Sequence, residues 1–411
     1  MKAVVLAAGK GVRLWPLTEN RSKHMIPIAG RPIIEHVISA IKSAGIRSLI
    51  VVTQYRGELI KKHLLDGTKL GVDIEYVNQT DVSGTANAVS VTKDRVGSHD
   101  FLVVYGDLVV SPRAIRRVVS TYRKSGRLTV GLVPVAHPQS YGMARTSGDR
   151  ITEIIEKPDQ SESQANLVNT GIYVLNPLIF DHLHATARSG RGELEITDTI
   201  SSVARSGTSV AWAMVDKLDW HDIGRPWEAL AANAQILARS RRRIAGKVEK
   251  GATIIGQVTI EKGATVKTGT VIEGPAWVGE DAILGPLAHV RAGTSIGKGT
   301  KIGNFCEIKN SIIMDHARIE HLSYVGDSII GEHCNLGAGT IVANLKFNDK
   351  TVRMRIKDAL VDTNLRKLGA ITGDNVKTGI NSSIMPSIRI ASGATIPPGA
   401  IVSEDVTSPS I

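Results

Sequence analysis

Two glycines and two cations near the start of the chain could bind phosphate groups. The stretch LAAGKGVRLWPLTENRSK places Gly9 and Gly11 in a loop after an apolar run, and Arg13 and Lys23 follow. The spacing lacks the third glycine of the dinucleotide fingerprint G-x-G-x-x-G and also the G-x-x-x-x-G-K-[ST] pattern of P-loops. What remains is a turn whose backbone N–H groups can approach phosphates closely, because glycine has no Cβ, followed by two cationic donors.

The elements expected around this loop are alternating strands and helices. Short β-branched runs such as KAVVLAAG, RSLIVVTQ, HDFLVVYGD and RLTVGLVPV alternate with helical stretches up to about Trp227. That alternation predicts a Rossmann-like α/β domain of parallel βαβ units, in which ligands gather at the carboxyl ends of the strands. We expect this domain over residues 1–228, followed by a linker helix over residues 229–248.

The pattern changes to a six-residue period after about residue 250. A column of mostly small residues lies two positions before each member of an aliphatic column. This period matches neither a helix nor a single strand, and it is typical of a left-handed parallel β-helix, which we expect over residues 249–411. The charged stretch LKFNDKTVRMRIKDALVDTNLRK interrupts the repeat and predicts a projecting loop. The aliphatic column is Ile254, Ile260, Val266, Ile272, Val278, Leu284, Val290, Ile296, Ile302 and Ile308.

Composition narrows the class of protein. The chain has 411 residues, which favours two domains, and a formal net charge of +11, which favours an anionic partner. The densest basic run, ILARSRRRIAGK, has no interleaved aromatic residues, so we expect phosphorylated small molecules rather than nucleic acid. No apolar run is long enough to span a membrane, and we expect a cytoplasmic protein. Cys306 and Cys334 are the only cysteines, and we expect both to be buried free thiols.

The motifs of residues 3–228 resemble those of the nucleotide-sugar pyrophosphorylases. The glycine loop resembles their L-A-[AG]-G-x-G-T-R-[LM] signature, with Val12 in place of the threonine. Four further motifs follow in the family's order: NQTDVSGTANAV, VVYGDL, YGMA with IIEKP, and VNTGIY with WHDIGRPW. The resemblance implies nucleotide binding by Leu6, Ala8, Gly9, Gly11, Gln79, Gly84 and Thr85, sugar phosphate binding by Gly142, Glu156, Lys157, Asn169 and Gly171, and Mg²⁺ binding by Asp107 and Asp222.

The reaction implied is attack by a sugar 1-phosphate oxygen on the α-phosphorus of UTP or dTTP, which releases pyrophosphate. The nucleophile is already an anion, so no general base is required, and repulsion between two polyanions is the obstacle. Arg13 and Lys23 are therefore the expected catalytic side chains, together with Mg²⁺, because cations stabilise the charge that develops.

The second half resembles the acetyltransferase half of the bifunctional GlmU enzymes. Their pattern GNF-x-E-x-K, GHL-x-Y-x-GD and N-x-GAGT with a following Asn is matched from Gly303 to Asn344, although Glu320 replaces a glycine. His321 is the expected base, since the unperturbed pKa of histidine suits neutral pH. The remaining assignments are substrate binding by Arg291, Lys309, Tyr324, Asn335, Asn344 and, in the projecting loop, Lys350, and acetyl-CoA binding by Ala338 and Ser382.

Together these features predict a two-reaction enzyme of UDP-N-acetylglucosamine synthesis. It would acetylate glucosamine 1-phosphate or galactosamine 1-phosphate with acetyl-CoA and then transfer UMP or dTMP to the sugar phosphate. A β-helix exposes grooves only at its edges, so we expect a homotrimer that completes each site between subunits. Two alternatives stay open: a pyrophosphorylase for glucose or mannose 1-phosphate with a structural β-helix, and a non-catalytic regulatory scaffold. After GAGT, the bacterial enzymes have CNYDG where this chain has ANLKF. In this respect the chain resembles the archaeal branch of two-domain enzymes.

Overall fold

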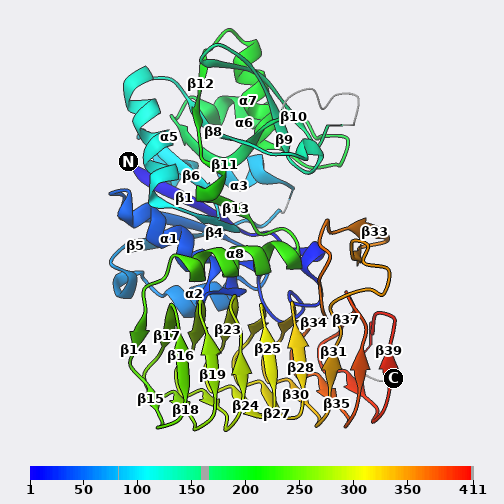
Figure 1. Ribbon diagram of the computed structural model, residues 1–411. Coiled ribbons are helices and arrows are strands. Elements are labelled where there is room, and N and C mark those ends of the chain that lie inside the picture. The colour runs from blue at the N-terminus through cyan, green and yellow to red at the C-terminus, as the bar shows by residue number, and fades with distance from the viewer. Residues whose placement is uncertain (82, 159–165, 409–411) are drawn as a thin grey trace. The chain divides into compact units, whose positions relative to one another are not determined.

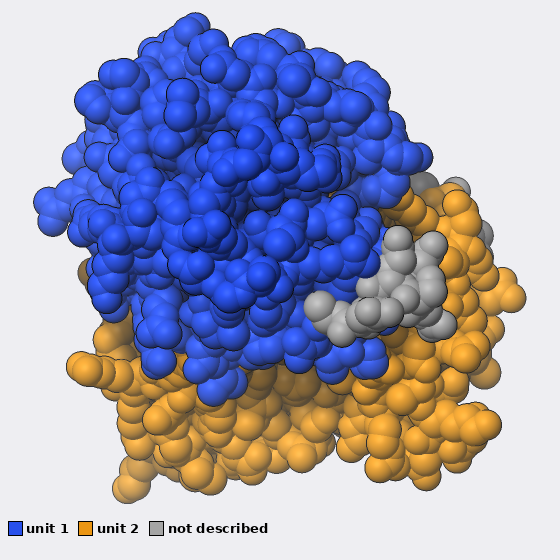
Figure 2. Space-filling view, turned by 90° about the horizontal axis from the view of Figure 1, so that it is seen from above, with its two compact units in different colours: residues 1–10, 33–222 blue, residues 11–32, 223–411 orange. Residues whose placement is uncertain are grey.

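The computed structural model describes residues 1–81, 83–158 and 166–408 (Figure 1). The chain forms two compact units, which Figure 2 shows in different colours. Unit 1 contains residues 1–10 and 33–222, and unit 2 contains residues 11–32 and 223–411. The chain therefore leaves unit 1 directly after its first strand and returns to it 22 residues later, at Ile33.

Unit 1 is built on a sheet of nine strands in the order β5-β4-β1-β6-β11-β8-β12-β10-β9. Strands β5, β4, β1 and β6 run parallel, whereas β11 is antiparallel to both β6 and β8. Strands β1, β4 and β6 are mostly apolar and buried, as expected for parallel strands covered on both faces, whereas β5 at the edge of the sheet has the more polar sequence DIEYVN. The strands are β1 (Lys2–Ala7), β4 (Ser48–Thr53), β5 (Asp73–Asn78), β6 (Phe101–Tyr105), β8 (Thr129–Pro134), β9 (Gly142–Ser147), β10 (Arg150–Glu156), β11 (Leu167–Leu175) and β12 (Val210–Met214).

Helices connect these strands and carry amphipathic sequences. In α5 (Pro112–Ser125), Ser111 caps the N-terminus by accepting a hydrogen bond from the Ala114 amide at 3.3 Å, and Gly126 ends the helix with φ of 67°. The short strands β7 (Leu108–Val110) and β13 (Trp220–Asp222) pair with each other apart from the main sheet. The other helices of unit 1 are α1 (Ile33–Ser43), α2 (Gly57–Leu64), α3 (Thr85–Ser90), α4 (Lys93–Val96), α6 (Ile179–His184) and α7 (Ile196–Arg205).

Unit 2 consists mainly of three parallel sheets of eight strands each, which together form a β-helix (Figure 1). Each strand pairs with the strand three elements further along, except where the projecting hairpin intervenes, so every coil contributes one strand to each sheet. The aliphatic column expected from the sequence is buried inside from Ile260 to Ile308, and Ile254 at its start is partly buried and packs against this core. The predicted fold class, an α/β domain followed by a β-helix, is confirmed.

The strands of the β-helix are short, as the six-residue repeat requires. The first sheet contains β14 (Arg243–Ile244), β17 (Val258–Ile260), β20 (Ala276–Val278), β23 (Thr294–Ile296), β26 (Ile312–Ile313), β29 (Ile329–Ile330), β34 (Ile371–Thr372) and β37 (Arg389–Ile390). The second contains β15 (Lys247–Val248), β18 (Thr265–Val266), β21 (Ile283–Leu284), β24 (Lys301–Asn304), β27 (Arg318–His321), β30 (Asn335–Leu336), β35 (Lys377–Thr378) and β38 (Thr395–Ile396). The third contains β16 (Thr253–Ile255), β19 (Val271–Glu273), β22 (His289–Val290), β25 (Glu307–Lys309), β28 (Tyr324–Gly326), β31 (Ile341–Val342), β36 (Ser383–Ile384) and β39 (Ile401–Val402).

Three segments of unit 2 lie outside the repeat. Helix α8 spans Pro226–Ala238, so the expected linker helix over 229–248 is shorter, and residues 243–248 instead begin the first coil. The hairpin of β32 (Arg353–Ile356) and β33 (Ala359–Asp362) forms within the predicted interruption. The segment 11–32 contains two short 3-10 turns, η1 (Val12–Leu14) and η2 (Lys23–Met25), and the strands β2 (Pro27–Ile28) and β3 (Arg31–Pro32). The domain boundaries at 228 and 249 stay a prediction.

Two further expectations concern the chain as a whole. Cys306 and Cys334 are free and buried, as expected, and burial raises the pKa of the Cys334 thiol to about 11. None of the helices in the described ranges has the length and hydrophobicity of a membrane-spanning segment.

Candidate active sites

The carboxyl end of β5 carries the residues predicted to bind the nucleobase. Gln79 is buried and donates from Nε2 to the Gly84 carbonyl at 3.1 Å and to Asn87 Oδ1 at 2.9 Å. Gly84 has φ of 128°, and a Cβ there would lie 2.4 Å from the Leu194 carbonyl oxygen. Only glycine fits this position, because both the backbone conformation and the close backbone neighbour exclude a side chain. The structure therefore brings Gln79 and Gly84 together.

Thr85 extends this cluster, whereas Leu6, Ala8 and Gly9 lie elsewhere in unit 1. Thr85 begins α3, and its hydroxyl donates to Glu195 Oε2 at 3.2 Å and accepts from the Ile196 amide at 2.9 Å. Leu6 and Ala8 are buried at the carboxyl end of β1, where the Gly106 amide donates to the Leu6 carbonyl at 2.9 Å. Their backbone follows the parallel strands to the edge where ligands of such sheets bind.

Glu156 is the centre of the predicted sugar-binding residues. Gly142 lies opposite Glu156 in the β9–β10 pairing, and a Cβ on Gly142 would come within 2.9 Å of Glu156 Oε2. Burial raises the pKa of the Glu156 carboxyl, and this effect is opposed by Arg191. Lys157 has φ of 50°, and its Nζ lies 4.0 Å from Glu156 Oε1. Glycine at position 142 thus leaves room beside a carboxylate that can accept from hydroxyl groups.

Asn169 and Gly171 lie in β11 beside two buried tyrosines. Asn169 donates from Nδ2 to the Tyr173 hydroxyl and accepts at Oδ1 from the Gly171 amide at 3.0 Å. A Cβ on Gly171, whose φ is 74°, would lie 2.6 Å from the ring of Tyr105. The Tyr105 and Tyr173 hydroxyls are 3.2 Å apart, and burial raises the pKa of both phenols well above the usual value. Both phenols are therefore neutral hydrogen-bonding groups at any ordinary pH.

An ionic cluster on the stretch RGELEITD escaped the sequence analysis. Arg191 Nη2 contacts Glu195 Oε1 and lies 3.7 Å from Glu156 Oε1. Burial raises the pKa of Glu195 to about 7, the charge of Glu156 adds to this effect, and Arg191 opposes it. Thr197 donates to Glu156 Oε2 at 3.4 Å. The signal available in the sequence was the density of charge, since Arg191, Glu193, Glu195 and Asp198 fall within eight residues.

Asp107 and Asp222 come close together through the small β7–β13 sheet. Asp222 pairs with Leu108, which directly follows Asp107, and Asp107 is buried. The described residues contain no group of three or more His, Cys, Asp or Glu side chains that could hold a metal ion. Two carboxylates nevertheless fit Mg²⁺, which prefers hard oxygen ligands and completes its shell with water and phosphate oxygens.

The two predicted catalytic cations lie on the segment 11–32 of unit 2. Gly11 has φ of 68°, and a Cβ there would lie 2.9 Å from Lys23 Cβ, so the absence of a side chain lets the two residues meet. Arg13 Nη2 is 2.9 Å from the position of a Cβ on Gly224. His24, the residue after Lys23, is buried, and its Nδ1 lies 2.7 Å from Ser22 Oγ. This contact holds the short η2 turn that presents Lys23.

In the β-helix, Asp327 connects most of the predicted acetyltransferase residues. Its Oδ2 accepts from Lys309 Nζ at 2.9 Å and from Asn344 Nδ2 at 2.5 Å, and its Oδ1 accepts from Asn310 Nδ2 at 2.7 Å. Asn344 also donates to the Tyr324 hydroxyl at 3.1 Å. Lys309, Tyr324 and Asn344 therefore form one constellation around a buried carboxylate, and Asp327 itself was not singled out from the sequence.

Arg291 lies one coil before Lys309, and His321 precedes Tyr324 within the same coil. Arg291 donates from Nη1 to Glu307 Oε1 at 2.8 Å, and this hydrogen bond raises the pKa of the guanidinium. Glu307 in turn pairs with Tyr324 in the next coil. His321 ends β27 with its side chain exposed, and its carbonyl accepts from Ser323 Oγ at 2.7 Å. The imidazole is thus accessible to a substrate.

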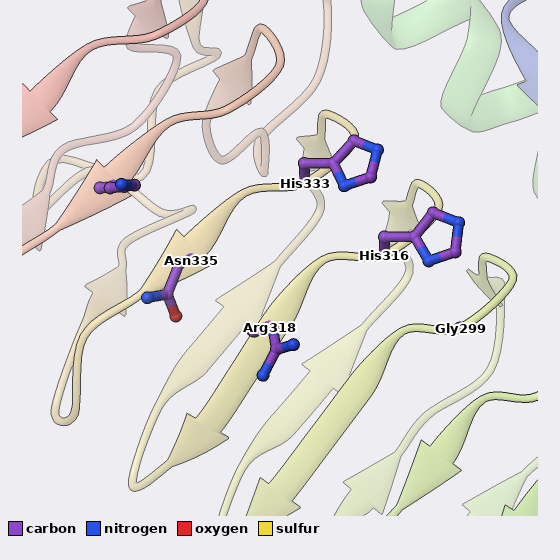
Figure 3. Close-up of a pocket in the computed structure, with 6 residues that line it drawn as sticks. Gly299, His316, Arg318, His333 and Asn335 are labelled. Atoms are coloured by element: carbon purple, nitrogen blue, oxygen red, sulfur yellow. The ribbon is translucent and has the colours of Figure 1, made fainter.

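The remaining acetyltransferase predictions fall at separate places. Asn335 lines a shallow pocket on the second sheet, where the rings of His316 and His333 stack with centroids 4.9 Å apart (Figure 3). Ser382 is fully buried, and its hydroxyl donates to the Gly379 carbonyl at 2.9 Å. The other residues are Ala338, whose carbonyl accepts from the Asn381 amide, and Lys350, which lines a second pocket beside the hairpin. Their roles in binding stay predictions.

Comparison with known proteins defines the class. The Nucleotidyl transferase family model matches residues 2–239, and that of the GMPPB C-terminal domain matches residues 272–379. A UDP-glucose pyrophosphorylase structure complexed with UDP-glucose covers 58% of this chain and 98% of its own, with a TM-score of 0.54 and 23% identity, which shows the shared fold. The chain is a member of the nucleotidyl transferase family.

Curated relatives extend the similarity over both halves. The chain is 40% identical to the Bifunctional protein GlmU of Methanococcus vannielii, over 99% of this chain and 96% of the relative. It is 38% identical to a bifunctional sugar-1-phosphate nucleotidylyltransferase/acetyltransferase of Sulfurisphaera tokodaii, over 99% of this chain and 98% of the relative. The chain belongs to the bifunctional GlmU family, of the archaeal two-domain type, which confirms the resemblance identified from its motifs.

Proposed function

We propose that the chain acetylates glucosamine 1-phosphate with acetyl-CoA and then transfers UMP from UTP to the product, giving UDP-N-acetylglucosamine and pyrophosphate. The observation that carries this proposal is the presence of two separate constellations in one chain. One surrounds Glu156 in unit 1, and the other surrounds Asp327 in unit 2. Galactosamine 1-phosphate and dTTP are the alternative substrates, because pocket geometry decides base and epimer.

For nucleotidyl transfer, the sugar phosphate oxygen attacks the α-phosphorus, and the bond to the pyrophosphate oxygen breaks. Gln79 would face the base, Glu156 would accept from sugar hydroxyls, and Asn169 would orient the sugar. Arg13 and Lys23 would stabilise the added negative charge of the transition state. Mg²⁺ held by Asp107 and Asp222 would supply further positive charge and order the phosphates when bound.

For acetyl transfer, the amine nitrogen of glucosamine 1-phosphate attacks the thioester carbonyl carbon. The C–N bond forms, the C–S bond breaks, and coenzyme A leaves as a thiolate that takes up a proton. His321 would remove the amine proton, because its exposed imidazole ends β27 at the edge of the coil. Lys309 and Arg291 would bind the phosphate, and Tyr324 and Asn344 would orient the sugar.

A homotrimer is proposed as the functional assembly. Three apolar side chains stack on successive coils beside His321: Leu287, Phe305 and Leu322, which are 48%, 62% and 61% exposed. The Phe305 amide donates to the Leu287 carbonyl at 3.2 Å, so these residues form one ladder along the edge. Burial of this ladder against a second copy would remove apolar surface from water and enclose the histidine. Ala338 would then line the acetyl-CoA groove, whereas Ser382, predicted for the same groove, is fully buried in the single chain.

The constellation around Asp327 speaks against a single-function pyrophosphorylase with a purely structural β-helix. A non-catalytic scaffold would not need the expected catalytic cations and Mg²⁺ ligands, and the chain has all of them: Arg13, Lys23, Asp107 and Asp222. The deciding experiment is a substrate matrix of UTP and dTTP against glucose, glucosamine, galactosamine and acetylated 1-phosphates, with acetyl-CoA consumption followed in parallel. We expect pyrophosphate release with UTP and N-acetylglucosamine 1-phosphate, and acetyl-CoA consumption with glucosamine 1-phosphate. Absence of the second activity would leave the pyrophosphorylase alternative.

A further inference from the structure

A buried arginine, Arg21, binds the segment that carries Arg13 and Lys23 to the β-helix through ion pairs. Arg21 Nη2 lies 2.7 Å from Asp374 Oδ1 and 3.0 Å from Glu332 Oε1, and Nη1 donates to Met314 Sδ at 3.0 Å. The side chains of Arg21 and Asp374 are only 7% and 8% exposed. Asn20 adds a hydrogen bond from Nδ2 to Asp374 Oδ2 at 3.3 Å. One side chain of the segment therefore binds turns from successive coils.

Glu19 makes a second attachment a few residues earlier. Its Oε2 accepts from the Ser392 amide at 2.7 Å, and its Oε1 accepts from Trp15 Nε1 at 2.6 Å. The Arg389 guanidinium lies 4.8 Å from the centroid of the Trp15 ring and is itself held by Asp405. The two attachments meet at Ser392, because its hydroxyl accepts from the Asp374 amide at 3.0 Å.

The receiving surface on the β-helix is acidic and preorganised. The Glu332 amide donates to Asp374 Oδ1 at 2.9 Å, so a backbone group of the β-helix orients the aspartate side chain independently of Arg21. Burial raises the pKa of Glu332, Arg21 opposes this effect, and Asp374 adds to it. The Asp374 side chain is 8% exposed and that of Glu332 is 39% exposed, so the buried aspartate in particular requires a neighbouring cation, since an uncompensated buried charge is strongly destabilising. Arginine suits this place because its planar group can bind two carboxylates at once.

We infer that Arg21, together with the coil turns that carry Glu332 and Asp374, is a positioning device for nucleotidyl transfer. The β-helix would thus serve the first reaction as well as the second, by holding the segment 11–32 in the conformation that presents Arg13 and Lys23. This inference rests on the proposed catalytic role of those two residues. Catalytic groups act only when they are held close to the productive geometry, and misplacement by about 1 Å can cost roughly 10²-fold in rate.

The test compares both reactions in single variants of the full chain. Arg21→Ala is expected to lower kcat for nucleotidyl transfer by about 10- to 100-fold with a much smaller change in KM, because the lost interaction acts on the transition state. Acetyl transfer is expected to stay within about 2-fold, since the constellation around Asp327 does not include Arg21. Arg21→Lys keeps the charge but not the planar fork, so it is expected to recover part of the rate.

The matched control is Lys298→Ala, which removes an exposed cation that pairs with Glu280 at 3.1 Å on another turn of the β-helix. We expect both activities of this variant to equal those of the unchanged protein. If Arg21→Ala fails to fold, Asp374→Asn tests the same pair, since it removes the charge and keeps an acceptor for the Glu332 amide. A normal nucleotidyl kcat in a folded variant of either residue overturns the inference, and so does an equal loss of both reactions. Absence of nucleotidyl transfer in the unchanged protein would instead refute the proposed function on which the inference rests.

Discussion

Asp327 holds three side chains of the β-helix site, and its replacement by asparagine should disable acetyl transfer while the coil stays folded. The backbone of Asp327 has φ of 50°, a left-handed conformation that asparagine tolerates well. The substitution also preserves size. Chemically, however, it replaces a carboxylate that accepts from Lys309, Asn310 and Asn344 with an amide that has one acceptor and one donor group.

The expected magnitude follows from these contacts. Loss of the charge-assisted bond to Lys309 is worth about 1.5–2 kcal/mol, and an amide NH₂ facing another donor costs about as much again. Asp327 is only 5% exposed, so water cannot readily replace the lost partner. The sum of about 3–4 kcal/mol corresponds to a roughly 10²- to 10³-fold fall in kcat/KM for acetyl transfer, if most of it is felt by the bound substrate.

The assay follows the thiol of coenzyme A released from acetyl-CoA with glucosamine 1-phosphate as acceptor. Asp281→Asn is the matched control, because Asp281 also adopts a left-handed conformation, with φ of 56°, at another turn. Nucleotidyl transfer by the same preparations reports whether the protein is folded and should be unchanged. An acetyl kcat/KM within 3-fold of the original value in Asp327→Asn would refute the role assigned to this carboxylate.

Three other predictions address the remaining groups. His321→Ala is expected to abolish acetyl-CoA consumption while pyrophosphate release from UTP and N-acetylglucosamine 1-phosphate persists, and parallel loss of both would contradict separate sites. Lys23→Ala is expected to slow nucleotidyl transfer by roughly two to four orders of magnitude, measured as pyrophosphate release, and an unchanged rate would remove Lys23 from the mechanism. The pKa of Glu195 is raised from 4.5 to about 7. Between these pH values the folded chain therefore retains a proton that the unfolded chain has lost. The free energy of unfolding should consequently fall as pH rises from about 4.5 to 7. Thermal unfolding measured across this range should show a weaker dependence in Glu195→Gln, and an identical dependence would argue against the shifted carboxyl.

The β-helix could be predicted because its signal is periodic and local. Each coil repeats the same inward-facing position, so the buried column from Ile260 to Ile308 is visible in the sequence without any knowledge of pairing. The motif residues Glu156, Asn169 and Tyr324 could be found because each lies in a short recognisable pattern. Their partners could not, because Arg191 and Glu195 meet Glu156 only through the packing of separate elements. Asp327 was not singled out because the motif predicts substrate ligands, whereas Asp327 contacts the side chains of such ligands, Lys309 and Asn344.

That the segment 11–32 packs with the β-helix could also not be predicted from the sequence. Arg21 and Asp374 are 353 residues apart, and nothing in NRSKH marks the arginine as a partner of a turn in the second half. Periodicity and motifs describe neighbours along the chain or within a repeat, whereas a single pair formed across this separation leaves no pattern. Two short attachments, at Glu19 and at Arg21, determine where the segment belongs.

The path of the chain between the two units limits how the protein can be divided. The polypeptide changes unit after Lys10, after Pro32 and after Asp222, so no single cut separates the units. A fragment that ends at residue 222 would keep Arg13 and Lys23 and lose Asp374, Glu332 and Ser392, which hold the segment that bears them. The reverse fragment would expose the acidic turns without their arginine. The two halves are consequently not interchangeable modules, and exchange of one β-helix for another between relatives would have to transfer residues 11–32 with it.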